Sequence, residues 1–554
     1  MGEFNSSQFE GESLDHLGLV AATIDYLGLE KLIDDMLPIS QEKGAKVPMS
    51  KRVSAMIMNG LGFIDDRLYM FPEFIEGTAI DRLLGPGLKA EYFNDDAIGR
   101  CLDAISDYGV TKFFSTLAFS MGRTLKLLGP TLNLDTTTLS LSGEYEDYVL
   151  DKEKPEIVVP AYGYSKQKRR DLKQVVLLLA TTGKANFPLL MSLHSGNASD
   201  QKTLHEAMEK INGICKGLED SPSFIYVADS ASYLQCVEKN TEGLRWVSRV
   251  PETIKEAKNL VAEDGRSWSE YGNGYKISPH TSHYGKVTQR WILVYSEQAY
   301  HREIKTVERK IPEEKVKQEK IVASWAKGRF ESEQEAKKAI KELEKTLKYH
   351  SLKADVQPIM KPVKKRKSKP EEASEVKSYA ILGILNEDVE AIAKAKRSCG
   401  RFIVATNELS QEALSDAGLL KEYKSQSELE KGFAFIKDDA FELSSVFLKT
   451  PSRIEALMAV MVLCLMVYNV SQYRLRKALK ENNDSILNQV KKPTDKPSMK
   501  WVYRIFTNVM VLNINVNGSS QQVVINVKDR LLKIIRYFGP KAMEIYSVEA
   551  CKAQ

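Results

Sequence analysis

The feature that most constrains the fold is a series of short apolar, strand-like segments that starts near residue 130, stops near 250 and resumes at 401. These segments predict strands at 131–139, 175–180, 188–193, 224–228, 245–250 and 401–405. Between and after them, apolar residues three and four apart predict helices at 200–213, 231–240 and 410–437. Strands that alternate with helices are typical of an α/β sheet domain. We therefore interpret 251–395 as an insertion inside one α/β domain.

The regions on either side differ from this sheet pattern. Residues 14–128 show helical periodicity throughout, with Asn94 a plausible cap before an apolar helix. The tail starts with a long apolar helix from 453, and two alternating segments around Asn517-Gly518 predict a β-hairpin. The predicted domains are a helical N-terminal domain, which is either a partner-binding module or a plain scaffold, an α/β domain in two parts, an insertion domain, and an α+β tail. Their boundaries are 1–128, 129–250, 251–395, 396–480 and 481–554.

Composition excludes several classes of protein. With 43% hydrophobic and 28% charged residues, the 554-residue chain is neither disordered nor fibrous. The net charge is only +5, but residues 301–370 hold 21 basic and 11 acidic side chains. The six cysteines contain no CxxC pair, which argues against a disulfide framework and a zinc site. The longest apolar run, 456–468, is shorter than the ~20 residues that span a bilayer, and no signal peptide is evident, so we expect a cytoplasmic protein with no membrane partner.

Three acidic residues are candidates for chemistry. Asp135 lies inside the apolar segment LNLDTTTLSL, where a carboxylate costs free energy unless it is paired or binds a metal; the alternative is a turn cap. Asp229 lies between an apolar strand and a helix, where α/β sheets bind ligands; the alternative is a helix cap. Glu430 lies on the 410–437 helix, and the alternative is an ordinary solvated side chain.

The neighbours of Glu430 favour a functional interpretation. Tyr423, Gln426 and Glu430 are three and four residues apart and share one helix face, with Lys437 two turns further on. Such a strip suits a metal-bound phosphodiester. Two Mg²⁺ ions about 3.5–4 Å apart can activate an attacking oxygen and stabilise a leaving one. Because Mg²⁺ takes hard oxygen ligands, three carboxylates are sufficient protein ligands.

The spacing Tyr423-x2-Gln426-x3-Glu430-x6-Lys437 resembles the tyrosine–arginine–glutamate–lysine signature, Y-x2-R-x3-E-x6-K, of bacterial insertion-sequence DDE transposases of the insertion-sequence-four superfamily. Only the arginine differs, since position 426 is glutamine. The resemblance covers nearly the whole chain, in an ordered series of segments: LGFIDDRLYMFPEF, NDDAIGRCLDAISDYG, GYSKQKRRDLKQ, SGNASD, WVSRVP, SRIEAL and KPTDKPSMKWV.

The resemblance implies a ribonuclease H-like catalytic domain interrupted by an insertion domain. It implies Asp135 on the first strand, Asp229 after the fourth and Glu430 on a late helix, together holding two Mg²⁺ ions for which Mn²⁺ can substitute. The implied partners are double-stranded DNA, namely the terminal inverted repeats and the target, and a second copy of the chain. The implied reaction is cleavage at the ends followed by joining of the 3′-hydroxyls to target DNA.

Several points stay open. Tyr423 and Lys437 take phosphate-binding roles by position, whereas Gln426 lacks the charge of the expected arginine and Lys424 is a candidate to compensate. One alternative function is a transposase-derived DNA-binding protein that no longer catalyses. Another is a ribonuclease H-like nuclease unconnected with transposition, against which the extra N-terminal and insertion regions argue.

Basic side chains gather in the segment GYSKQKRRDLK, between the first two predicted strands. They are candidates for DNA phosphate contacts near the acids, and the alternative is a solvated edge strand protected by its charges. The residues are Lys166, Lys168, Arg169, Arg170 and Lys173. The lysine-rich run 361–369 is either a DNA-binding segment or a plain linker, and the pair His280 and His283 lacks a third metal ligand.

Overall fold

The structure, a computed structural model, describes residues 9–38, 46–62, 71–141, 158–163, 169, 171–198, 200–216, 223–239, 243–328, 330–360, 376–437, 450–516 and 519–549. The chain divides into two compact units. The first comprises residues 1–246 and 422–554, and the second comprises 247–421. The domain boundaries given above remain predictions; the two units are described separately below.

The sheet of the first unit confirms the predicted α/β class. Its strand order is β4-β3-β2-β5-β6. Strands β2, β3 and β4 are antiparallel neighbours, and β5 runs parallel to β2 on the other side. All five predicted strands are present, with small shifts in their bounds: β2 (Thr131–Leu141), β3 (Lys173–Thr182), β4 (Phe187–Ser195), β5 (Ile225–Ala228) and β6 (Arg245–Arg249).

Helices cover this sheet, so its strands are buried along most of their length. In β2 every residue is buried except Asp135 and Ser140, which are partly exposed. The predicted helices between the strands are α8 (Asp200–Lys216) and α9 (Ser230–Lys239). Helix α8 contacts β2 and α9 contacts β5. Strand β4 is contacted by α7 (Val110–Thr124) and α15 (Pro451–Glu481).

The N-terminal region is helical, as predicted. The predicted cap is confirmed, because the Asn94 side chain accepts a hydrogen bond from Ala97 N at 3.0 Å. An ion pair ties this region to α15, with Arg453 Nε 2.7 Å from Asp103 Oδ1. The remaining helices are α1 (Leu17–Leu27), α2 (Leu29–Met36), α3 (Met49–Leu61), α4 (Phe71–Glu76), α5 (Ile80–Leu84) and α6 (Asp95–Tyr108).

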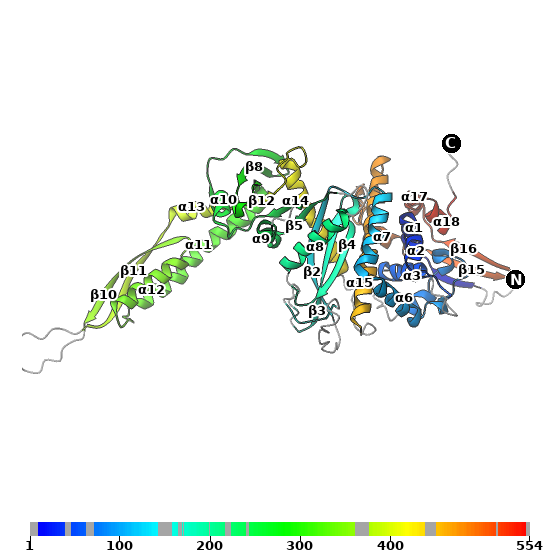
Figure 1. Ribbon diagram of the computed structural model, residues 1–554, viewed down its shortest axis with the longest axis horizontal. Helices are drawn as coiled ribbons and strands as arrows, with labels where there is room; N and C mark the ends of the chain where they lie inside the picture. Colours follow the sequence, from blue (N-terminus) through cyan, green and yellow to red (C-terminus); the bar gives the residue numbers. More distant parts are fainter. Residues whose placement is uncertain are drawn as a thin grey trace, which may run out of the picture. The chain divides into compact units, whose positions relative to one another are not determined.

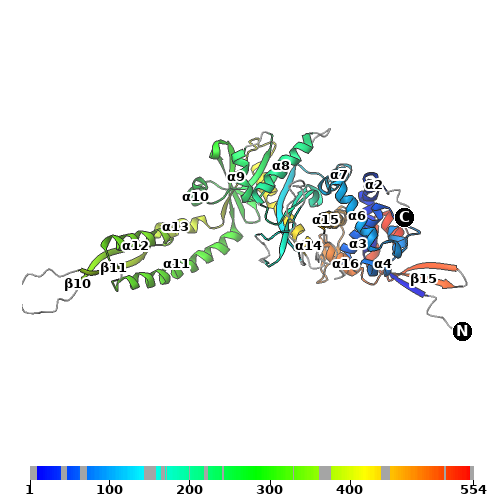
Figure 2. The same ribbon diagram turned by 60° about the horizontal axis from the view of Figure 1, so that its bottom comes forward.

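Helix α15 is the central helix of the first unit. In both Figure 1 and Figure 2 it lies among the N-terminal helices (blue), and it contacts α1, α3, α6, α7 and β4. It has 31 residues and is longer than its apolar run, 456–468. Its last turns, beyond that run, are polar. By length and composition alone it could cross a membrane. However, 78% of its most apolar window is buried inside the unit, which is the behaviour of a core helix.

Helix α15 also carries a carboxyl group at an unfavourable place. Burial raises the pKa of Glu455 from 4.5 to about 7, and Lys210 offsets this only partly. An acid with a raised folded-state pKa destabilises the folded protein as pH rises from the unfolded pKa, 4.5, to the folded one, about 7.

We therefore expect Glu455→Gln to raise the free energy of unfolding by roughly 2 kcal/mol at pH 8, and by less at pH 5. Denaturant unfolding at the two pH values measures this. The exposed Glu91→Gln is the control, with no change expected. An equal effect of Glu455→Gln at both pH values would contradict the burial argument.

The two ends of the described chain meet in one small sheet, which the sequence did not predict. Strand β1 (Phe9–Ser13) pairs antiparallel with β15 (Met510–Val516), which in turn pairs with β16 (Ser519–Ile525). The β15–β16 ladder confirms the predicted hairpin; its Asn517-Gly518 turn lies outside the described residues. The tail also contains β13 (Ile486–Leu487), β14 (Pro493–Thr494), α16 (Met499–Ile505), α17 (Asp529–Tyr537) and α18 (Pro540–Ile545).

The strands of the second unit belong to the same nine-stranded sheet and follow β6 in the order β12-β9-β8-β7. Strand β12 (Arg401–Thr406), one of the predicted strands, pairs with the end of β6 and with β9. Helix α14 (Asp416–Ile436) starts in this unit and continues into the first. The other elements around this sheet are α10 (Lys255–Ala262), β7 (Ser269–Gly272), β8 (Tyr275–Ser282), β9 (Gln289–Ser296) and α13 (Val389–Ser398).

The charged segment that follows β9 is helical over most of its length. It is two helices, α11 (Glu297–Trp325) and α12 (Glu333–Thr346), followed by an antiparallel pair, β10 (His350–Met360) and β11 (Val376–Glu387). Both helices contact this strand pair, as Figure 2 shows. The lysine-rich run 361–369 lies between the two strands and outside the described residues.

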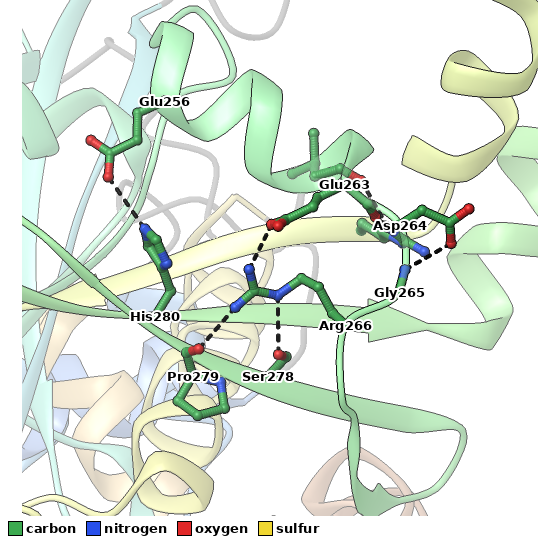
Figure 3. A network of polar contacts seen from close by, with 10 residues as sticks. Glu256, Glu263, Asp264, Gly265, Arg266, Ser278, Pro279 and His280 are labelled. Carbon is green, nitrogen blue, oxygen red and sulfur yellow. Dashed lines mark hydrogen bonds and ion pairs between the residues drawn. The ribbon is translucent and has the colours of Figure 1, made fainter. Parts of the chain in front are cut away.

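Two histidines and three tryptophans of this unit make local contacts. His280 Nε2 lies 3.3 Å from Glu256 Oε1, and the neighbouring Arg266 binds Glu263, Ser278 and Pro279 (Figure 3). His283 Nδ1 lies 3.3 Å from the Thr288 hydroxyl. Trp291 is fully buried, Trp325 packs against Phe330, and the Arg401 guanidinium lies over the Trp268 ring.

Candidate active site

Asp135 and Asp229 lie at the same level on neighbouring strands. Strands β2 and β5 pair in parallel, with Leu132 opposite Tyr226 and Asn133 opposite Val227. Extended by two residues along both strands, this register places Asp135 opposite Asp229. Neighbouring strands are about 4.8 Å apart. The structure thus brings together two carboxylates that are 94 residues apart in sequence.

Each of these two aspartates has a defined local environment. Asp135 lies inside strand β2, which excludes the turn-cap alternative, and its Oδ1 accepts a hydrogen bond from Thr136 N at 2.7 Å. Asp229 follows the last residue of β5 and is exposed. Its Oδ1 accepts from Ala231 N at 3.0 Å, so it does cap α9 as the structural alternative held. The cap uses one carboxylate oxygen of Asp229 and leaves the side chain at the strand end. Capping α9 is therefore compatible with a role as a metal ligand.

Helix α14 lies against the same face of β2 as Asp135. Thr131 Oγ1 donates to Glu422 Oε2 at 2.6 Å, and Ser425 Oγ donates to Asn133 Oδ1 at 3.0 Å. Alternate residues of a strand point to one face, so the side chains of residues 131, 133 and 135 share it. The helix and the strand advance in the same direction through these contacts.

Helix α14 continues beyond these two contacts to Glu430. Glu422, Gln426 and Glu430 are spaced by four residues and lie along one stripe of α14. Glu430 lies eight residues beyond Glu422 on this stripe, which is about 12 Å along the helix axis. Glu430 is exposed, so this end of the stripe is open to solvent.

The remaining signature residues belong to the same helix face. At about 100° per residue, Tyr423, Gln426 and Glu430 fall within a narrow sector of α14. Lys437 follows the last helical residue, and its backbone N–H still bonds Phe433 O at 3.0 Å, which keeps it in helical register. Tyr423, Gln426 and Lys437 are all partly exposed.

The donor set suits a hard cation, although the three acids are not gathered into a finished metal site. Within the ranges that the structure describes, no three acidic, histidine or cysteine side chains lie close enough to hold an ion. All three candidates offer carboxylate oxygens, which Mg²⁺ prefers. Asp135 lies in strand β2, Asp229 lies at the end of β5, and Glu430 is exposed on α14.

The predicted basic segment is only partly visible. Lys166, Lys168 and Arg170 lie outside the described residues. Arg169 Nη2 forms an exposed ion pair with Asp171 at 2.8 Å, which raises the pKa of Arg169 and lowers that of Asp171. Lys173 is the first residue of β3, opposite Leu141. Both side chains of this ion pair are exposed, and the DNA contacts of the segment stay a prediction.

Four residues that position the site were missed in the sequence. Thr131, Asn133, Glu422 and Ser425 join α14 to β2. A signal was available: polar residues alternate with leucine in Thr131-Leu-Asn133-Leu-Asp135, and Glu422 precedes Gln426 and Glu430 at the same four-residue spacing. Their partners could not be known without the fold.

Comparisons with known proteins identify the family of the chain. Residues 130–469 match the family described as "Transposase DDE domain", and residues 9–119 match a "Domain of unknown function (DUF4277)". A search of curated proteins finds no match. One solved structure, "Cryo-EM structure of piggyBac transposase synaptic complex with hairpin DNA (SNHP)", is 10% identical and covers 89% of this chain and 79% of that one. Its TM-score is 0.35. Because the transposase match spans more than half of its length, the chain belongs to the DDE transposase family.

Proposed function

We propose that the protein is the transposase of a bacterial insertion sequence, which binds the terminal inverted repeats of its element, cleaves at the ends and joins the freed 3′-hydroxyls to target DNA. The observation that carries the proposal is the parallel register that aligns Asp135 with Asp229, together with the α14 stripe that leads to Glu430. Family membership supplies the chemistry class, transfer of phosphodiester bonds in DNA.

The strand order supports a ribonuclease H-like catalytic domain. Three antiparallel strands, β2 to β4, are followed by β5 and β6 on the other side of β2, with helices between them. In this arrangement the first strand is central, so a carboxylate on it lies beside the end of the fourth. Along the sequence, the segment 247–421 lies between the two aspartates and most of α14.

Two Mg²⁺ ions, or Mn²⁺ in their place, would supply activation of the attacking oxygen and stabilisation of the leaving one. Asp135, Asp229 and Glu430 would hold them. The first step breaks the bond between phosphorus and the 3′-oxygen at the transposon end. A water oxygen bonds to phosphorus, and the 3′-oxygen leaves as a hydroxyl.

In the second step that 3′-hydroxyl oxygen attacks a target phosphorus, displacing a target 3′-oxygen. Tyr423, Gln426 and Lys437 would hold phosphates near the reacting bond. Two ends must be joined in one event, so we propose a homodimer on DNA, acting in the cytoplasm. We propose that the N-terminal helices read the terminal repeat.

The strand-transfer step tests the proposal directly. Purified protein would be mixed with pre-cleaved end DNA, target plasmid and Mg²⁺, and joined products counted. The proposal predicts joining by the wild type and none by Asp229→Ala. Retained strand transfer in Asp229→Ala would refute it. End binding without cleavage in any divalent metal would instead favour a silent, transposase-derived DNA-binding protein.

Gln426 provides a milder test of the phosphate-binding stripe. We expect Gln426→Arg to tighten binding of end DNA about tenfold, because a hydrogen bond to a charged group contributes roughly 1.5–3 kcal/mol and tenfold is about 1.4 kcal/mol. Fluorescence anisotropy with labelled end DNA measures the change. Unchanged or weaker binding would mean that the new cation pairs with Glu422 or Glu430 on the same stripe instead of with phosphate.

A further inference from the structure

A groove of about 720 Å³ lies in the first unit, and the proposed chemistry does not use it. One wall is the second half of α15, and the opposite wall is α14. The turn between β3 and β4 and the segment before α16 close the ends. Tyr468 lies on the α15 wall and Gly432 on the α14 wall. Asn186 lies in the β3–β4 turn and Lys496 in the segment before α16.

This groove lies on the face of α14 opposite the acid stripe. Its α14 residues are Glu428, Lys431, Gly432 and Phe435, spaced by three, one and three residues. At about 100° per residue, the centre of this set is roughly half a turn of the helix away from Glu430. One helix therefore separates the groove from the proposed catalytic face.

The groove is rich in cations. Five basic side chains line it and only two acidic ones, Glu428 and Asp495, do so. The basic residues are Lys431, Arg476, Lys477, Lys480 and Lys496. Three of them follow one another along α15, where Arg476 and Lys480 stand one turn apart. Like charges four residues apart disfavour a helix, so this arrangement has a cost in the free protein.

The protein itself neutralises only part of this charge. Lys431 pairs with Glu428 at 2.5 Å and Lys477 with Glu481 at 3.7 Å. In the described part of the chain, Lys480 and Lys496 have no ion-pair partner within 4.0 Å. The negative end of the α15 helix dipole attracts Lys480 and accounts for a lysine at that position. It does not account for Lys496, which lies on another segment.

Arg476 is placed to accept an anion. Its Nε donates to Pro497 O at 2.9 Å, which fixes the guanidinium at the groove. Burial lowers the pKa of Arg476, and the negative charges of Glu428 and Asp495 offset this shift only in part. A guanidinium held in this way can bind phosphate oxygens with its terminal nitrogens.

The floor of the groove is aromatic and rigid. The Phe435 and Tyr468 rings lie 4.7 Å apart between centroids. The Tyr468 hydroxyl accepts a hydrogen bond from Lys500 N at 3.2 Å, and Gln472 Oε1 accepts from Met499 N at 3.3 Å. These bonds hold the groove in one shape, so its cations need little reorganisation to bind a ligand.

We propose that this groove binds the phosphate backbone of a DNA segment other than the phosphodiester held at the acids. The proposal rests on the proposed function for the identity of the ligand as DNA. Arg476 and Lys480 are about 6 Å apart along the axis of α15, and each DNA strand carries one charge per 3.4 Å of helix axis. Cations in a row along a groove match a chain of phosphates better than one compact anion.

The salt dependence of DNA binding tests this site. The full-length wild type and Lys480→Gln/Lys496→Gln would be titrated with a 30-bp duplex of random sequence, in EDTA, over a range of salt concentrations. Each lost phosphate contact reduces the slope of log Kobs against log salt by about 0.9, so the double variant should lose about 1.8. The matched control is Lys210→Gln/Lys239→Gln, two exposed lysines of α8 and α9, with an unchanged slope expected.

The outcomes separate this inference from the proposed function. An unchanged slope in the groove variant, or no binding of random duplex by the wild type, would overturn the inference. Saturable binding of inorganic pyrophosphate that the groove variant abolishes, with no change in the DNA slope, would assign the groove to a small anion and also overturn it. The predicted slope change in a protein that never cleaves its ends would uphold the groove and refute the transposase reaction. Equal unfolding temperatures of variant and wild type would exclude misfolding as the cause of a slope change.

Discussion

Asp135→Asn is expected to lower the rate of DNA cleavage at the transposon ends by at least about 1,000-fold, since stabilisation by a bound metal is worth several kcal/mol and each 1.36 kcal/mol is tenfold in rate. Asparagine has nearly the same shape as aspartate, so strand β2 and its pairing with β3 should persist. What is lost is the negative charge at the centre of the sheet, opposite Asp229.

Single-turnover cleavage of end DNA in saturating Mg²⁺ measures this effect. Glu238→Gln, an exposed carboxylate on α9, is the matched control and should cleave like the wild type. Binding of end DNA in EDTA should be equal in all three proteins. A rate for Asp135→Asn within tenfold of the wild type would remove Asp135 from the metal site.

Leu463→Ala is expected to destabilise the first unit by roughly 3–5 kcal/mol, the range for large-to-small changes at fully buried positions. Leu463 is 0% exposed on α15. That helix contacts both the N-terminal helices and strand β4, so a cavity there weakens the support of the sheet as well as the N-terminal region.

Denaturant unfolding measures this loss, with Leu487→Ala as the control. Leu487 is 58% exposed, and surface substitutions usually change stability by less than about 0.5 kcal/mol. Similar values for the two variants would mean that α15 does not organise the core. That outcome would also reopen the question of whether this long apolar helix is a soluble core element.

The sheet around the acids could be predicted from sequence because its strands are buried on both faces. Apolar runs such as those of β3 and β4 allow few other interpretations, and the predicted bounds differ from the observed ones by only a few residues. The register between β2 and β5 could not be predicted. It joins segments 94 residues apart, and only the pairing itself shows that Asp135 and Asp229 are level.

The elements that were missed are amphipathic or depend on distant partners. After its buried first residue, strand β10 alternates exposed and partly exposed residues and carries charges, so it lacks the apolar run that predicts a strand. Strand β1 forms only because β15, some 500 residues later, offers an edge. The break between α11 and α12 did have a local signal. Ser332 Oγ accepts from Glu335 N at 3.2 Å, and Glu335 Oε2 accepts from Glu331 N at 3.1 Å, a reciprocal cap that resembles the S-x-x-E capping box.

The measurement that tests the central claim most directly uses a plasmid that carries the DNA flanking this gene, with both putative ends. The plasmid would be incubated with purified wild-type protein or Glu430→Gln, with Mg²⁺ or with EDTA. The account predicts double-strand breaks at the ends for the wild type in Mg²⁺, and none with EDTA or with Glu430→Gln. Breaks of equal yield with Glu430→Gln, or breaks without preference for the ends, would contradict it.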